Sequence, residues 1–186
     1  MAASTRSARA RRFSVALVSS PLGLLKVALR EGKLLALAFP AEERFLARLS
    51  RRLPDPRPPS RLACGEPSGP DAAALAELSR QLGLYFSRLK KSFFLPLVPV
   101  GTPFQQRVWA ELQRIPYGSV RTYAEVARAL GSPKLARAVG GACAANPLPI
   151  VIPCHRVVAS GGGLGGYSAG LEVKRLLLEL ESGGRH

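Results

Sequence analysis

The sequence predicts an α+β protein of two domains: a small amino-terminal domain with a three-stranded antiparallel sheet and helices, and a mostly helical carboxy-terminal domain. Two patterns predict this fold class. Short apolar runs separated by turn residues precede Pro40, which is typical of an antiparallel meander. Beyond Gly101 the apolar residues recur at helical spacing instead. We place the domains at residues 13–97 and 98–186, after a basic, disordered tail at residues 1–12.

Three strands separated by turn-like segments are expected in the first domain. They cover residues 13–17, 22–29 and 33–39, with Ser20-Pro21-Leu22-Gly23 and Arg30-Glu31-Gly32 between them. A short helix is expected at residues 41–50. Residues 53–70 contain six prolines and are expected to form a loop without a chemical role.

A longer helix is expected after this loop. Asp71 is a favourable N-cap, because its side chain can accept from a free backbone N–H of the first turn. Apolar residues then follow at helical spacing and predict a stripe that faces the core, made by Leu75, Leu78, Leu82, Phe86 and Leu89. Residues 94–100, with two prolines, are expected to connect the domains in an extended conformation.

Three helices are expected in the second domain. Thr102 caps the first, which begins at Pro103, ends before Pro116-Tyr117-Gly118 and buries Phe104, Val108, Trp109 and Leu112. Thr122 caps the second, with Glu125 at the capping-box position. The third covers residues 135–142, after a break at Gly131-Ser132-Pro133. The last two are typical of a helix-turn-helix, although many helical domains contain such a pair.

The third helix carries small residues, Ala136, Ala138, Gly140 and Gly141, around a single large side chain, Arg137. A helix that reads bases in the major groove would present Asn, Gln or several Arg side chains. Small side chains instead allow close approach to the narrow minor groove, with Arg137 free to enter the duplex. Close packing inside a core is the alternative, but burial of an unpaired Arg137 would be costly on at least one face.

Composition narrows the classes of partner. The chain has 186 residues, of which 47% are hydrophobic, so a core of ordinary size is expected. No apolar run approaches the roughly 20 residues that span a bilayer, and we expect no membrane partner. The net charge of +15, from 27 basic and 12 acidic residues, favours a polyanion such as nucleic acid. This support is weak, because the carboxy-terminal half is the less basic one.

The cysteines predict neither a metal site nor a disulfide framework. Cys64, Cys143 and Cys154 lack metal-ligand spacing, and the chain has only two histidines. We expect no metal and no cofactor. An odd number of cysteines suits a reducing compartment, so the cytoplasm is expected, or the nucleus in a eukaryote. The basic tail lacks the apolar stretch of a secretory signal, and an organelle-targeting segment is the alternative to a frayed end.

Residues 150–158 place a thiol, Cys154, beside an imidazole, His155, in an apolar segment. Only a thiolate is a strong nucleophile, and a nearby base is the usual means of forming it. The apolar run before Pro153 predicts a buried strand that the proline ends. The structural alternative is a buried cysteine that acts as a small hydrophobe, beside a histidine whose hydrogen bonds are satisfied.

Pro153-Cys154-His155-Arg156-Val157 resembles the active-site signature of the O6-alkylguanine-DNA alkyltransferases, also called methylated-DNA–protein-cysteine methyltransferases. Further motifs agree in order and spacing: Pro116-Tyr117-Gly118, Tyr123, residues 136–142, Asn146-Pro147, Gly165, Tyr167-Ser168 and Lys174. The resemblance is dense over residues 101–181 and looser over 13–97. It implies a ribonuclease H-like amino-terminal domain.

The resemblance also implies DNA repair by direct reversal. An alkyl group would move from O6 of guanine, or O4 of thymine, in double-stranded DNA to Cys154, in one irreversible turnover without a cofactor. The base would first be flipped out of the duplex from the minor groove, because the duplex hides the alkylated oxygen. The chain would act as a monomer, and cooperative assembly on DNA is left open.

Residue roles follow from the resemblance in the same way. His155 would be a water-mediated base held by Glu181, and Asn146 would order the segment around the thiol. Arg137 would fill the gap left in the base stack, and further DNA contacts would come from Tyr123, Ala136, Ala138, Gly140 and Ser160. The substrate pocket would be formed by Tyr123, Cys143, Pro149, Val157, Tyr167 and Ser168. In it, Tyr167 and Ser168 would donate towards O6, the backbone of Cys154 and Val157 would accept from the guanine amino group, and Pro149 would form an apolar wall.

Departures from the family concern its accessory parts. The amino-terminal domain lacks the Cys and His zinc ligands of some members, and the cysteine-rich domain of the adaptive-response regulators is missing. Cys143 and Ala144 are smaller than the residues relatives often carry at the pocket rim, which bears on the alkyl groups accepted. Two other functions are considered: a lesion-binding protein without turnover, and a helix-turn-helix regulator with a structural cysteine. Cys154, His155 and Glu181 together favour the enzyme.

Overall fold

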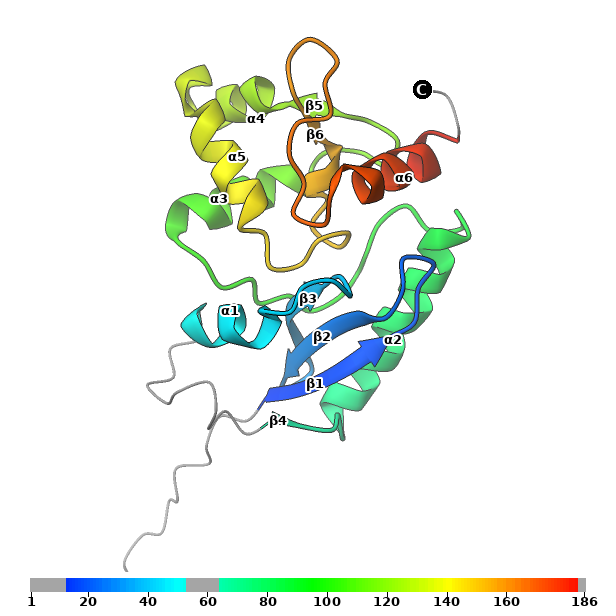
Figure 1. Ribbon diagram of the computed structural model, residues 1–186. Coiled ribbons are helices and arrows are strands. Elements are labelled where there is room, and N and C mark those ends of the chain that lie inside the picture. Colours follow the sequence, from blue (N-terminus) through cyan, green and yellow to red (C-terminus); the bar gives the residue numbers. More distant parts are fainter. Residues whose placement is uncertain (1–12, 53–63, 184–186) are drawn as a thin grey trace, which may run out of the picture.

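The computed structural model describes residues 13–52 and 64–183. Figure 1 shows a sheet with two helices in the amino-terminal part and a group of helices in the carboxy-terminal part. The predicted α+β fold class is confirmed. The basic tail at residues 1–12 and most of the proline-rich loop, residues 53–63, lie outside the described residues.

The sheet is built from a three-stranded meander. Strands β1 (Phe13–Val18), β2 (Leu25–Arg30) and β3 (Lys33–Ala38) pair antiparallel in chain order, close to the predicted ranges. A fourth strand, β4 (Cys64–Gly65), pairs in parallel with the start of β1 and gives the order β3-β2-β1-β4. The sequence predicted a loop there, since two residues are too few to produce a strand periodicity.

Both faces of the sheet are covered, and the side chains of β2 show how. Val27 and Leu29 pack in the same cluster as the buried face of α2 (Pro70–Phe86). Ala28, between them, packs in a separate cluster with α1 (Phe45–Arg52). Neighbouring residues of a strand point to opposite faces, so helices on both sides explain why consecutive residues of β2, Val27 to Leu29, are all apolar and buried.

The start of α2 differs from the prediction for Asp71. The N-cap is Gly69, and Asp71 lies in the first turn, so the predicted cap is wrong. The carboxylate of Asp71 instead accepts from the Ser14 hydroxyl and from the backbone N–H of Gly32, both at 2.7 Å. Asp71 therefore ties α2 to β1 and to the β2–β3 turn, a tertiary role that a local capping pattern does not reveal.

The apolar stripe of α2 is mostly as predicted. Leu78 and Leu82 are fully buried, whereas Leu75 and Phe86 are partly buried. The prediction that Leu89 belongs to this stripe is wrong, because the residue lies beyond the end of the helix and is 76% exposed. The chain leaves the helical direction at Arg88, whose φ of 61° is left-handed.

The connection between the two parts runs along the edge of the sheet. Leu34 of β3 donates to Pro96 and accepts from Val98, each at 2.9 Å, so the predicted extended segment pairs briefly with β3. The proline has no N–H to donate, and at this edge it acts only as an acceptor.

The carboxy-terminal part is helical and confirms both predicted caps. Its helices are α3 (Pro103–Leu112), α4 (Tyr123–Ala129), α5 (Ala136–Ala144) and α6 (Leu171–Ser182). Thr102 with Gln105, and Thr122 with Glu125, form complete capping boxes. Pro133–Leu135 form a 3-10 turn, η2, so that α5 begins one residue after the predicted start.

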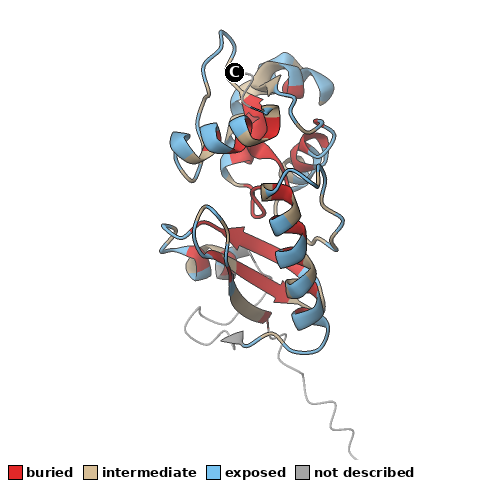
Figure 2. Ribbon diagram, turned by 90° about the vertical axis from the view of Figure 1, so that its right-hand side faces the viewer, coloured by how far each residue is buried: buried red, intermediate tan, exposed pale blue. Residues whose placement is uncertain are grey.

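The core of the carboxy-terminal part centres on α3. Val108, Trp109 and Leu112 are fully buried as predicted, while Phe104 is half-buried. The Trp109 indole donates to the carbonyl of Ala142 at 2.9 Å and so ties α3 to α5. The largest buried cluster continues from the sheet into these helices, and Figure 2 shows the buried stretches in both parts.

This core generates a stability prediction. Leu82→Ala should lower the free energy of unfolding by roughly 2–5 kcal/mol, because it leaves a cavity in the cluster between α2 and the sheet. Leu89→Ala, at an exposed position, should change it by less than about 0.5 kcal/mol. Denaturant titration of both variants measures the difference, and equal losses would contradict the assignment of the buried face.

Candidate active site

The segment that carries the thiol is buried but is not the predicted strand. Residues 147–153 turn tightly, and Ile150 has a left-handed φ of 73°, which is strained for a β-branched residue. Asn146 closes the turn: its amide oxygen accepts from Leu148 at 3.0 Å and its amide nitrogen donates to Ile152 at 2.8 Å. An apolar run predicts burial, but these side-chain bonds decide the backbone conformation.

Cys154 begins a 3-10 turn, η3 (Cys154–Arg156), and its thiol is held by Asn146. The amide nitrogen of Asn146 donates to Sγ of Cys154 at 3.0 Å, and only 3% of the residue is exposed. Burial raises the pKa of the Cys154 thiol to about 11, and the Asn146 hydrogen bond opposes this shift. The resting thiol therefore keeps its proton at neutral pH and needs a base to react.

His155 supplies a base whose orientation is fixed. Its Nε2 lies 2.8 Å from Oε1 of Glu181, and both side chains are buried. Burial raises the pKa of Glu181, but hydrogen bonds from His155 and Arg156 outweigh it and hold the pKa at about 2. An ionised carboxylate can only accept, so Nε2 of His155 carries the hydrogen and Nδ1 presents a lone pair. Burial also lowers the pKa of His155, which favours the neutral ring.

Glu181 gathers further donors. Arg156 binds it with Nε at 2.8 Å and Nη2 at 2.9 Å, the paired geometry that suits a guanidinium and a carboxylate. The backbone N–H of Gly118 donates at 3.1 Å, and the hydroxyl of Tyr85, on α2, donates at 2.8 Å. The carboxylate is thus fully bonded, which offsets the cost of burying its charge.

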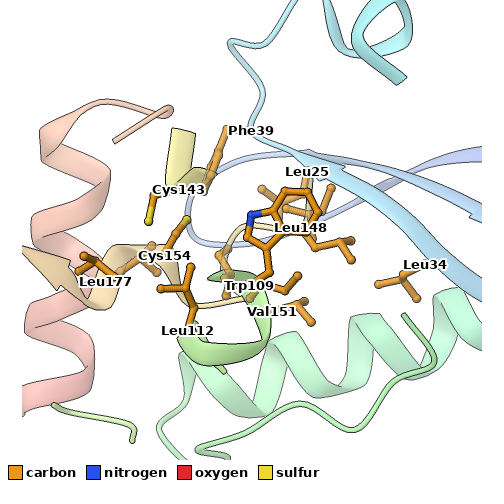
Figure 3. Close-up of a cluster of buried hydrophobic side chains, with 14 of the residues drawn as sticks. Leu25, Leu34, Phe39, Trp109, Leu112, Cys143, Leu148, Val151, Cys154 and Leu177 are labelled. Atoms are coloured by element: carbon orange, nitrogen blue, oxygen red, sulfur yellow. The ribbon is translucent and has the colours of Figure 1, made fainter. Parts of the chain in front are cut away.

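The thiol borders a cavity of about 630 Å³ beside α5. Its lining brings together many of the predicted residues: Tyr123, Ala136, Arg137, Gly140, Cys143, Ala144, Cys154, Gly166, Tyr167 and Ser168. Figure 3 shows Cys143 and Cys154 near each other within the buried cluster of side chains, close to Leu177. A parallel pair of short strands, β5 (Arg121–Thr122) and β6 (Val157–Val158), holds the start of α4 beside η3.

Two buried polar atoms of the described residues have no protein partner: Nδ1 of His155 and the hydroxyl oxygen of Tyr167. Buried polar groups are normally bonded, so two such atoms around one thiol indicate a place for a ligand or solvent. Tyr167 lines the cavity, and burial raises the pKa of its hydroxyl, which keeps it a donor. This arrangement argues against the alternative of a purely structural cysteine and histidine.

Besides His155, Asn146 and Glu181, which lie behind the thiol, four predicted residues lie outside the lining of this cavity. Pro149 lines an adjacent cavity, which shares Ser168 with the first. Val157 is buried, and its carbonyl accepts from Lys174 at 2.5 Å. Ala138 is exposed on α5, and Ser160 is exposed in the loop after β6. The last two lie on the surface and do not line the cavity.

Sequence reasoning missed Tyr85 and Arg156 as members of the site. The position of Arg156 next to His155 was a usable signal, since both side chains of a tight turn can reach one carboxylate. Tyr85 gave none, because it lies 96 positions from Glu181 within an apolar stripe. Lys174 was identified only as part of a sequence motif, without a role. In the structure it is fully buried and donates to the carbonyls of Val157, Leu164 and Gly166.

The described residues contain no group of three or more His, Cys, Asp and Glu side chains that could hold a metal ion. Within the same ranges, no helix has both the length and the apolar character needed to cross a membrane.

Comparisons with known proteins match both parts of the chain. Residues 14–99 match the family model described as 6-O-methylguanine DNA methyltransferase, ribonuclease-like domain. Residues 103–183 match the model described as 6-O-methylguanine DNA methyltransferase, DNA binding domain. The ribonuclease-like description agrees with the fold that the resemblance implied.

Curated relatives carry the name methylated-DNA–protein-cysteine methyltransferase. The one from Methanosarcina acetivorans is 52% identical over 105 residues, which cover 56% of this chain and 67% of the relative. The one from Mycolicibacterium paratuberculosis is 42% identical over 164 residues, which cover 88% of this chain and 89% of the relative.

Solved structures resemble the whole described fold. The crystal structure of Mycobacterium tuberculosis OGT in complex with DNA has a TM-score of 0.77 at 36% identity, covering 92% of this chain and 94% of that one. An O6-methylguanine-DNA methyltransferase from Pyrococcus kodakaraensis has a TM-score of 0.62 at 32% identity, covering 91% and 98%.

The buried carboxylate generates a prediction of pH-dependent stability. The pKa of Glu181 is about 2 in the folded chain against an ordinary 4.5, so its stabilising effect is complete above pH 4.5 and is lost as the pH falls towards 2. Glu181→Gln should lower the free energy of unfolding at pH 7 by roughly 3 kcal/mol, because it breaks a buried ion pair. The difference from the parent should shrink between pH 4.5 and 2.

Chemical denaturation across this pH range measures the effect. Glu179→Gln is the matched control, because Glu179 is exposed on the same helix. A constant difference between Glu181→Gln and the parent at every pH would contradict the assignment.

Proposed function

The chain belongs to the 6-O-methylguanine DNA methyltransferase family, and from that premise we propose that it repairs alkylated DNA by moving the alkyl group irreversibly onto its own Cys154. The enzyme class predicted from the sequence, methylated-DNA–protein-cysteine methyltransferase, is confirmed by the curated relatives. One observation carries the proposal for Cys154: its thiol borders a cavity while the neighbouring His155 has a free, oriented Nδ1.

The proposed reaction is a displacement at the alkyl carbon. A water between Sγ of Cys154 and Nδ1 of His155 carries the thiol proton to the imidazole. The thiolate attacks the alkyl carbon, an S–C bond forms and the C–O6 bond breaks, with its electron pair leaving on the guanine. The proton taken from sulfur returns to the base, so the products are S-alkyl cysteine and guanine. A thioether is stable in water, so the thiol does not re-form and each chain reacts once.

Stabilisation of the leaving guanine is assigned to the cavity wall. The hydroxyl of Tyr167 has no protein partner, and Ser168 lines the same cavity, so both can donate towards O6 as negative charge develops there. Donors held in place before the reaction need no reorganisation, which makes their effect large in a site closed to water. Transfer from O4-alkylthymine would use the same oxygen position.

Double-stranded DNA is the proposed partner, approached through α5. Among the described residues of this helix, Arg137, Ala138, Gly141 and Ala144 are exposed, and all but Arg137 are small. Small side chains permit close contact with the minor groove and little base readout, which suits a protein that must scan every sequence. The thiol is only 3% exposed, so a stacked base cannot reach it and must be flipped into the cavity.

Arg137 is proposed to fill the place that the flipped base leaves. It lies at the cavity that would receive the base, and it is the large side chain on the exposed face of α5. Tyr123, from the start of α4, lines the same cavity and would contact the flipped nucleotide and its 3′ phosphate. The protein is proposed to act as a monomer, in the cytoplasm or, in a eukaryote, in the nucleus.

Replacement of Cys154 tests the acceptor. Incubation with O6-methylguanine DNA should add one methyl group per parent chain, whereas Cys154→Ala should gain none and keep its affinity for DNA. Intact mass and a gel-shift titration measure these outcomes. Cys143→Ala, which removes the other thiol of the cavity, should still be methylated. Methylation of Cys154→Ala would contradict the proposal, and a parent that binds lesions without gaining mass would be a lesion sensor instead.

Replacement of Arg137 tests base flipping. Arg137→Ala should slow transfer at saturating duplex DNA by roughly tenfold or more, because unstacking a base costs a few kcal/mol. Transfer from free O6-benzylguanine should be nearly unchanged. Lys134→Ala removes a nearby exposed charge and should weaken DNA binding without changing the saturated rate. Single-turnover rates are measured on duplex DNA and on free O6-benzylguanine. An equal loss of rate on both substrates would contradict the role of Arg137 in the base stack.

A further inference from the structure

Tyr85 belongs to α2, in the part of the chain that contains the sheet, yet its hydroxyl ends at the alkyl-transfer centre. It donates to Oε1 of Glu181 at 2.8 Å, and the side chain is fully buried. The same oxygen lies 2.8 Å from Nε2 of His155. Tyr85 and His155 therefore share one carboxylate oxygen.

The ring of Tyr85 is held by aromatic neighbours. Its centroid lies 5.3 Å from that of Phe86, 5.4 Å from Phe93 and 6.0 Å from Tyr117. Burial raises the pKa of the Tyr85 hydroxyl, and the negative charge of Glu181 raises it further, so the group keeps its proton. A protonated hydroxyl on a ring with little freedom is a permanent donor to Glu181.

This hydrogen bond affects the protonation of His155. Each hydrogen bond to Oε1 withdraws part of the charge that would otherwise stabilise a protonated imidazole. The charged groups that act on His155 are Glu181 and Lys174 from α6 and Arg156 from η3. Three tyrosines, Tyr85 from α2, Tyr117 and Tyr167, interact with Glu181. Among the charged groups, Glu181 favours the charged imidazole, and Arg156 and Lys174 oppose it.

We propose that Tyr85 is a positioning residue of the transfer centre, which holds the Glu181 carboxylate and keeps His155 neutral and able to accept the proton of Cys154. The inference rests on the proposed function, since it places Tyr85 in the same proton relay. It also assigns the amino-terminal part a role in the chemistry, through one hydroxyl group.

Tyr85→Phe tests the inference, because it keeps the ring and removes only the donor. The pKa of His155 should rise, and the acid limb of the transfer rate should move to higher pH by about half a unit. The rate should therefore fall about threefold on the acid limb and match the parent above it. A loss of packing would instead lower the rate equally at every pH.

Phe93→Leu is the matched control, since Phe93 packs on the Tyr85 ring and, within the described residues, has no hydrogen bond to Glu181 or His155. It should leave the acid limb in place. NMR titration of His155 gives a readout that needs no transfer, and the other histidine, His186, is removed by His186→Gln. Tyr85→Phe should raise the midpoint of His155, and Phe93→Leu should not.

The outcomes of these experiments separate the role of Tyr85 from the proposed function. An unchanged His155 midpoint in Tyr85→Phe, the same shift in both variants, or a rate loss independent of pH overturns the inference while the proposed function stands. A parent protein that gains no methyl group refutes the proposed function first, and the role of Tyr85 in the relay falls with it even if the His155 midpoint shifts.

Discussion

The structure depends on one buried carboxylate. Glu181, near the end of α6, accepts five hydrogen bonds: from Tyr85, Gly118, His155 and two nitrogens of Arg156. A buried charge without such partners would destabilise the fold by several kcal/mol. Because the donors come from separate segments, satisfying this charge also fixes α2, α6 and the turn that carries the thiol relative to one another. The hydrogen bonds that stabilise the buried charge of Glu181 therefore also orient His155.

The burial that lowers the reactivity of the Cys154 thiol also protects it. With 3% of Cys154 exposed and its pKa raised to about 11, the group is a protonated thiol in the resting protein. Only a thiolate is readily alkylated or oxidised. The proposed reaction uses this nucleophile once, and it requires a thiol that stays inert until a nucleobase occupies the cavity and the relay to His155 removes the thiol proton. Asn146, which donates to Sγ, stabilises the thiolate once it forms.

Local patterns predicted what local interactions determine. The caps predicted at Thr102 and Thr122 were correct because each capping box is complete within four residues. The prediction for Asp71 failed because its carboxylate bonds to the sheet, and the strand predicted before Pro153 is instead a turn closed by Asn146. The family resemblance supplied Glu181 as the partner of His155. It did not supply Tyr85, which lies 96 positions from Glu181 and is connected to it by no sequence periodicity.

The neutral state of His155 follows first from its burial, and then from a charge balance in which Arg156 and Lys174 oppose Glu181. Glu181 alone beside His155 would favour a protonated imidazole, which cannot act as a base. Arg156 binds both carboxylate oxygens and forms a pair with no net charge, so the imidazole beside it has little reason to take up a proton inside a buried site. Glu181 can then fix the ring through Nε2 while leaving Nδ1 free. In the proposed relay, the adjacency of His155 and Arg156 in the sequence therefore has a chemical reason: His155 presents the base, and Arg156 opposes the charge that would protonate it.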